Sequence, residues 1–96
     1  MVYVISLEKQ TDVRFNLWSH EVLGVVSSEF KVSQVLLDLT LEQFPHCVQS
    51  IDVENLLYQL TDAFSNREDK TYFKYTFEVE GEFKGNFYVD LVQVYE

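Results

Sequence analysis

The longest regular pattern of apolar and polar residues lies near the C-terminus, in residues 71–96. Four apolar residues alternate there with polar ones: Phe73, Tyr75, Phe77 and Val79. This period of two predicts a strand with one buried and one exposed face. Apolar residues return at odd positions in the following stretch: Phe83, Phe87, Val89 and Leu91. A three-residue loop at either Glu80-Gly81-Glu82 or Lys84-Gly85-Asn86 would keep both apolar rows on one face, so the pattern predicts a β-hairpin.

The N-terminal third also favours strands. Residues 2–7 are almost continuously apolar, which is typical of a central strand, and residues 8–12 are predicted to form a polar turn. Alternation over residues 13–18 predicts a second strand, antiparallel to the first, with a helix over residues 13–26 as the alternative. Residues 22–26, centred on Gly24, are expected to form another short strand or a bulged continuation.

The middle of the chain contains one clear helix. Residues 53–65 carry an apolar stripe at helical spacing, Asp52 suits the N-cap, and Ile51 and Leu56 are placed as a hydrophobic staple. Residues 30–42 fit two templates. Alternation in the second half of that segment favours a strand, which we predict, with a helix as the alternative. Pro45 is expected to end either element.

Together these elements predict an α+β fold in a single domain spanning residues 1–96. We expect a mostly antiparallel sheet that ends in the long C-terminal hairpin and packs against one amphipathic helix. The odd-numbered row of the hairpin is then the face that the helix covers.

Charge narrows the classes of partner. Sixteen acidic residues against seven basic ones give a formal net charge of -9, and no Lys or Arg occurs between Lys31 and Arg67. Direct binding to nucleic acid or to an anionic membrane is disfavoured, because both require neutralisation by Lys and Arg. A basic protein partner is expected instead. The alternative is that the acidity only keeps a monomer or weak dimer soluble.

No targeting or membrane pattern is evident. The apolar runs are far shorter than the ~20 residues that a membrane-spanning helix needs, and no basic region precedes an apolar stretch as in a signal peptide. The single cysteine, Cys47, excludes an internal disulfide and agrees with a reducing compartment. We therefore expect a cytoplasmic protein.

Candidate catalytic chemistry is sparse. His46 lies next to Cys47 and would point away from it on an extended chain, and His20 is the only other histidine. Two isolated histidines and one cysteine do not form a metal-ligand pattern, and no glycine-rich phosphate loop occurs. We expect no enzyme activity, no cofactor and no metal.

Two surfaces are candidates for binding a partner. One is the even-numbered row of the hairpin, where tyrosines and carboxylates share a face: Tyr72, Glu78, Glu80, Glu82, Tyr88 and Asp90. The other is the helix stripe Glu54-Tyr58-Asp62, spaced four residues apart and opposite the apolar side of the helix. The alternatives are that another part of the domain covers the hairpin row and that the stripe is only the solvated side of its helix.

In size, acidity and single-domain build, and in its lack of catalytic residues, the chain resembles the small immunity proteins of bacterial contact-dependent growth-inhibition and related polymorphic toxin systems. The resemblance implies a non-catalytic inhibitor that binds a basic protein, such as a nuclease toxin, and occludes its active or nucleic-acid-binding site. Two alternatives remain: a phage-encoded inhibitor of a nucleic-acid-binding host defence complex, and an accessory interaction subunit.

Overall fold

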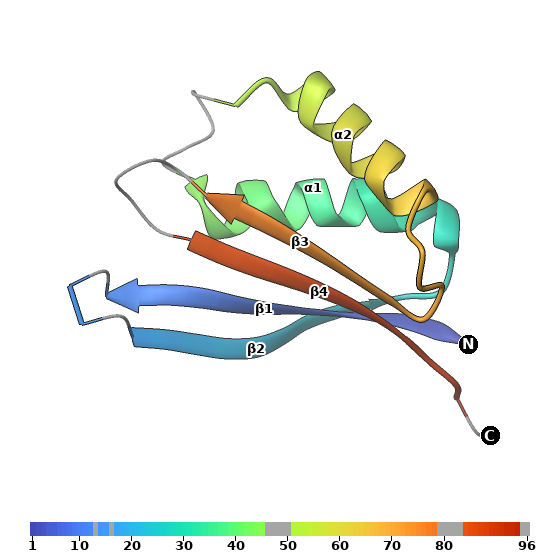
Figure 1. The fold of residues 1–96 in the computed structure, drawn as a ribbon, viewed down its shortest axis with the longest axis horizontal. Helices are drawn as coiled ribbons and strands as arrows, with labels where there is room; N and C mark the ends of the chain where they lie inside the picture. Colours follow the sequence, from blue (N-terminus) through green and yellow to red (C-terminus); the bar gives the residue numbers. More distant parts are fainter. Residues whose placement is uncertain (13, 16, 46–50, 79–83, 95–96) are drawn as a thin grey trace.

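The computed structural model describes residues 1–12, 14–15, 17–45, 51–78 and 84–94. Strands β1 (Val2–Asp12) and β2 (Leu17–Val26) are followed by a short 3-10 helix η1 (Glu29–Lys31), then by helices α1 (Val32–Gln43) and α2 (Val53–Ser65), and finally by strands β3 (Tyr72–Glu78) and β4 (Lys84–Val92). The strands form one antiparallel sheet, and both helices lie on the same side of it (Figure 1). The predicted α+β class is confirmed.

The first and last strands of the chain meet at the centre of the sheet. The strand order is β2-β1-β4-β3, so β1 and β4 are the inner strands and β2 and β3 form the edges. Both helices lie on one side of this sheet, and no helix or strand of the described residues covers its other face (Figure 1).

The C-terminal hairpin has the predicted alternation and pairing. Tyr72 pairs with Asp90 and Glu78 pairs with Lys84, which places the odd-numbered rows of both strands on one face. Phe73, Phe77, Phe87 and Val89 are buried there, as expected. Of the two predicted loops, Lys84-Gly85-Asn86 is wrong, because these residues belong to β4. The other loop, Glu80-Gly81-Glu82, lies outside the described residues.

The N-terminal hairpin is longer than predicted and displaced along the chain. Residues 8–12 continue β1 instead of forming a turn, and the second strand begins at Leu17, after the turn residues Arg14 and Phe15. Glu8 and Lys9 pair with both β2 and β4, and Gln10 and Asp12 pair with β2, so cross-strand pairing holds these polar residues in a strand despite their low intrinsic preference. The expected bulged continuation is confirmed, because the pairing shifts by one residue where Ile5 pairs with Gly24 and Ser6 with Val22.

The predicted strand at residues 30–42 is wrong, because Val32–Gln43 form helix α1. This helix packs against α2 and the sheet through one buried side, and its exposed side carries Gln34, Asp38 and Glu42. Apolar residues also occupy partly buried positions between the two sides, so they do not form a narrow helical stripe. Thr40 is fully buried, and its hydroxyl donates to the Leu36 carbonyl at 2.7 Å. Thr40, one of the polar residues that alternate with leucines in this segment, is thus part of the core. The helix ends just before Phe44 and Pro45, as predicted.

Helix α2 begins and ends as its sequence predicts. The Asp52 carboxylate accepts a hydrogen bond from the Asn55 backbone N–H at 3.1 Å and caps the first turn. Leu56, Leu60 and Phe64 are buried against the rest of the core. At the C-terminus, the Arg67 guanidinium donates to the Phe64 carbonyl at 2.7 Å. A cation is stabilised there by the negative end of the helix dipole.

Candidate functional site

The face of the sheet opposite the helices is the most distinctive surface of the molecule. Strand pairing places four rows of side chains across it, and we call these residues the open sheet face. The rows consist of Thr76, Asn86, Glu8 and His20; of Lys74, Tyr88, Ser6 and Val22; of Tyr72, Asp90, Val4 and Val25; and of Val92 and Val2. Neither helix lies on this side of the sheet (Figure 1).

One half of the open sheet face is apolar and exposed to solvent. Val22 and Val25 on β2 are 64% and 61% exposed, and Val92 on β4 and Tyr72 on β3 are also exposed. Tyr72 contacts the half-buried Tyr88 at 6.3 Å between ring centroids. An apolar patch built from several strands is typical of a surface that binds another molecule.

A half-buried carboxylate lies within this patch. Asp90 pairs across the strands with Val4 on one side and with Tyr72 on the other. Within the described part of the chain, no Lys, Arg or His lies within ion-pair distance of its carboxylate. A carboxylate surrounded by valine and tyrosine side chains gains most from a cation whose aliphatic stem can contact the same patch.

The other half of the face is polar and internally hydrogen-bonded. Thr76 Oγ1 donates to Asn86 Oδ1 at 2.8 Å, and Asn86 Nδ2 donates to Glu8 Oε1 at 3.0 Å. The bonds join three strands in one line. Partial burial, the charge of Glu8 and a hydrogen bond to that carboxylate together raise the pKa of Tyr88. His20 lies beside the same tyrosine, with 6.1 Å between ring centroids.

Two lysines lie on the strands of the C-terminal hairpin, Lys74 on β3 and Lys84 at the start of β4. Lys74 Nζ lies 5.7 Å from the centroid of the Tyr88 ring, a cation–π arrangement. Lys84 is 3.6 Å from the Glu78 carboxylate, and both side chains are about half exposed. The Tyr88 ring thus already accommodates a lysine ammonium from its own chain.

The structure brings three of the six predicted hairpin residues into the rows of the open sheet face: Tyr72, Tyr88 and Asp90. Glu78 pairs with Lys84 at the end of the hairpin, beyond these rows. The other two, Glu80 and Glu82, lie outside the described residues. The contribution of β2 to this face, His20 and Val22, was not predicted. The even-numbered spacing of these β2 residues was the available signal. The prediction placed the strand earlier in the chain, at residues 13–18, and assigned its apolar side to the odd-numbered residues.

The helix stripe Glu54-Tyr58-Asp62 is exposed, as expected, but it lies apart from the hairpin residues. All three side chains project from α2 on the helix-bearing side of the sheet, and Tyr58 is 71% exposed. Asp62 already accepts a hydrogen bond from the Asn66 side chain at 3.1 Å. The two candidate docking surfaces are therefore on opposite sides of the molecule.

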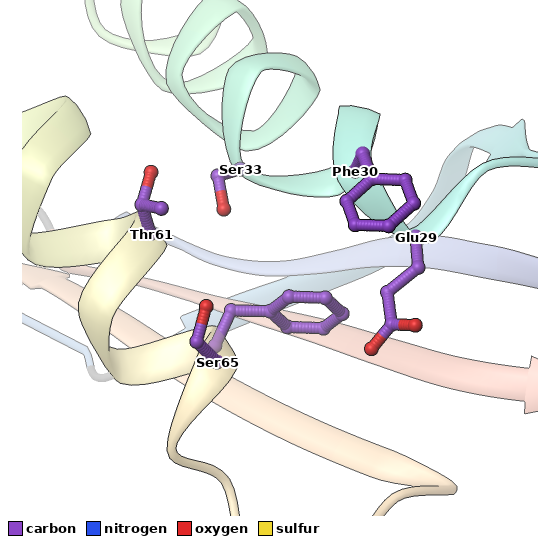
Figure 2. A pocket seen from close by; sticks show the side chains of 6 residues that line it. Glu29, Phe30, Ser33, Thr61 and Ser65 are labelled. Atoms are coloured by element: carbon purple, nitrogen blue, oxygen red, sulfur yellow. The ribbon is translucent and has the colours of Figure 1, made fainter.

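A small pocket opens between η1 and the two helices (Figure 2). Its volume is about 120 Å³, and six residues line it: Glu29, Phe30, Ser33, Thr61, Phe64 and Ser65. The Glu29 carboxylate is held at 2.9 Å by the guanidinium of Arg67. The pocket is smaller than the ~300 Å³ or more that small-molecule sites occupy.

The described residues contain no grouping of three or more His, Cys, Asp or Glu side chains that could hold a metal ion. His46 and Cys47, the pair considered for nucleophilic catalysis, lie outside those residues. No helix within the same ranges is long and apolar enough to cross a membrane.

Comparison with known proteins finds no matching family model, no similar curated protein and no similar solved structure.

Proposed function

We propose that this chain is a non-catalytic inhibitor that binds a basic protein and blocks its working surface, in the manner of a toxin immunity protein. One observation carries the proposal. Asp90 lies half-buried in an exposed valine and tyrosine patch, without a cationic partner among the described residues. An arginine or lysine from another protein would complete this arrangement, and the net charge of -9 would attract such a protein over long range.

The mechanism is occlusion. Tyr72 and the valines provide apolar contact area, while Asp90 and Glu8 pair with basic groups that otherwise contact a nucleic-acid phosphate. The partner's substrate is excluded because the substrate and this chain would occupy the same positively charged surface of the partner. We also propose that the protein acts in the cytoplasm and as a monomer.

The first experiment measures binding to the basic protein encoded or captured alongside this chain. We expect the association rate to fall steeply between low and high salt, because long-range attraction is screened over about 10 Å at 0.1 M. A single-stranded DNA oligonucleotide serves as the negative probe. An acidic partner, a rate that does not change with salt, or tight binding of the oligonucleotide would contradict the proposal.

Matched variants then identify the docking face. Tyr72→Ala and Asp90→Lys alter the open sheet face, whereas Tyr58→Ala and Asp62→Lys make the same chemical changes on α2. We expect Tyr72→Ala to weaken binding about 30-fold, as for a hot-spot residue worth about 2 kcal/mol, and Asp90→Lys to reduce the association rate. If only the α2 variants lose binding, the interface is the helix stripe, and the proposal of a basic partner still holds.

A further inference from the structure

Strand β2 forms an edge of the sheet that the proposed function does not use. In the sheet of the described strands, β2 borders β1 alone, and β3 forms the opposite edge (Figure 1). Alternate residues of an antiparallel edge strand direct their backbone N–H and C=O groups away from the sheet. Within the described part of the chain, the backbone of residues 19–22 has no hydrogen-bond partner other than β1. The outer side of β2 therefore offers donors and acceptors to a further strand.

The β2 edge lacks the residues that usually protect an edge strand from pairing. Natural proteins protect such edges with lysines, prolines or bulges. The other edge strand, β3, carries Lys74 near its centre, whereas the ten residues of β2 include no Lys, Arg or Pro. The register between β2 and β1 shifts near both ends of β2, but it is regular over residues 18–22. This regular segment is long enough to pair with a strand of ordinary length, about five residues.

Both faces of the regular segment are open to solvent. His20 and Val22 lie on the open sheet face, and both are exposed. Ser19 and Glu21 lie on the helix-bearing side of the sheet, and they are exposed as well. The helices thus leave this part of β2 uncovered. A strand added beside it would have room for side chains on both of its faces.

The side chains of β2 select the composition of an added segment. Val22 offers an apolar contact on one face. On the other face, Glu21 is the only acidic residue of β2, and no Lys, Arg or His among the described residues lies within ion-pair distance of its carboxylate. Neighbouring strands are stabilised where apolar residues or opposite charges meet on the same face. A segment in which apolar and basic residues alternate would match both faces of β2.

We propose that the outer edge of β2 binds an extended segment of another protein, in which apolar and basic residues alternate, as a fifth strand of the sheet. Main-chain hydrogen bonds provide the affinity, and contacts with Val22 and Glu21 fix the register. A second copy of this chain matches the edge less well, because its β2 offers no base to Glu21 and each copy carries a net charge of -9. The inference goes beyond the proposed function, which uses the open sheet face, and does not depend on it.

The edge site can be tested without any protein partner. The probe is a hexapeptide of alternating lysine and valine, acetylated and amidated at its ends. It is titrated into the full-length, isotopically labelled chain and followed by two-dimensional amide NMR and by hydrogen–deuterium exchange. The comparison peptide carries N-methyl groups on its two central residues, so it has the same side chains and charge but cannot pair continuously along either edge.

We expect saturable shifts of the β2 amides and slower exchange of alternate amides in residues 18–22. The N-methylated peptide should bind about tenfold more weakly, because it loses a central main-chain hydrogen bond. Equal affinity for both peptides would overturn the proposal, since charge alone would then explain binding. Broadening of β2 signals that grows with the concentration of the chain alone would also overturn it, by identifying a second copy as the occupant. Peptide shifts confined to β3 and β4 would refute the edge site and still agree with the proposed inhibitor function.

Variants provide a second readout. Val22→Lys places a lysine on the β2 edge at a position that is 64% exposed, and should weaken the alternating peptide several-fold while the chain stays folded. Val94→Lys makes the same change at an exposed residue after β4 and should not. Glu21→Gln should also weaken the peptide, whereas Glu68→Gln removes the same charge at an exposed residue outside the sheet and should not. Unchanged peptide affinity in a folded Val22→Lys variant would refute the site.

Discussion

Gly85 should be the least replaceable glycine among the described residues. It lies on the core side of β4, where a β-carbon would stand 2.7 Å from Phe44 Cζ, 3.0 Å from Cε2 of the same ring and 3.2 Å from Leu7 Cδ1. The Phe44 ring is fully buried and packs against Phe77, with centroids 4.8 Å apart. Lys9 Nζ lies 5.0 Å from its centroid. The ring therefore has little room to move away from a new methyl group.

The expected cost of Gly85→Ala follows from two opposing terms. Overpacking a tight core typically costs about 1–3 kcal/mol, and replacing a strand glycine by alanine recovers about 0.5–1 kcal/mol by restricting the unfolded chain. The 2.7 Å approach to a buried ring places the overpacking cost in the upper part of its range, at about 2–3 kcal/mol, so the net loss is about 1–2.5 kcal/mol. For a domain of this size that corresponds to a melting temperature lower by about 4–20 °C.

Gly24→Ala is the matched control. Gly24 lies in β2, and a β-carbon there meets no heavy atom within 4 Å. The same substitution should therefore stabilise the fold by about 0.4–1 kcal/mol through the unfolded chain alone. Urea and thermal unfolding of both variants measure the difference.

A double-mutant cycle isolates the contact between Gly85 and Phe44. Phe44→Leu removes the ring atoms nearest to the new methyl group, so Gly85→Ala should cost much less in that background. If Gly85→Ala is as stable as the unsubstituted chain, or if its cost is unchanged beside Phe44→Leu, the steric argument is wrong.

Two further predictions concern α2 and the pH dependence of stability. Asp52→Ala should destabilise the fold by about 1 kcal/mol, because the Asn55 N–H loses its capping acceptor, while Asp52→Asn should retain most of the stability in urea unfolding. Burial raises the pKa of Tyr75 from 10.0 to about 12, so its contribution to stability is fully present below pH 10.0 and is lost as the pH rises toward about 12. Unfolding curves of Tyr75→Phe across this range should show a shallower alkaline loss than the unsubstituted chain, and parallel curves would contradict the assignment.

The hairpin and α2 were predictable because their signals are local. Alternating residues in β3 and β4 separate one face from the other, and the pairing from Tyr72–Asp90 to Glu78–Lys84 preserves that separation. Asp52 caps α2 within its own first turn. In both cases, neighbouring residues in the sequence provide most of the information that decides the conformation.

The candidate site was only partly predictable. Tyr72, Tyr88 and Asp90 were recognised because they alternate with core residues in one hairpin. Val22 and Val25 join them only through the pairing of β2 with β1, and β1 joins β4 only through contacts between opposite ends of the chain. A pattern read along the sequence contains no direct signal for a patch assembled across four strands.

The sequence by itself determined the α+β class, the terminal hairpin, the helix at residues 53–65 and the acidity of the chain. Tertiary structure decided the rest, and α1 shows why. One side of this helix is buried and includes Thr40, whose hydroxyl is satisfied by the Leu36 carbonyl, while Gln34, Asp38 and Glu42 are exposed on the other side. Apolar residues also occupy the partly buried positions between the two sides: Val35, Leu39 and Leu41. A polar residue in the buried side and apolar residues at its edges blur the helical period in the sequence, so only the packing distinguished this helix from a strand.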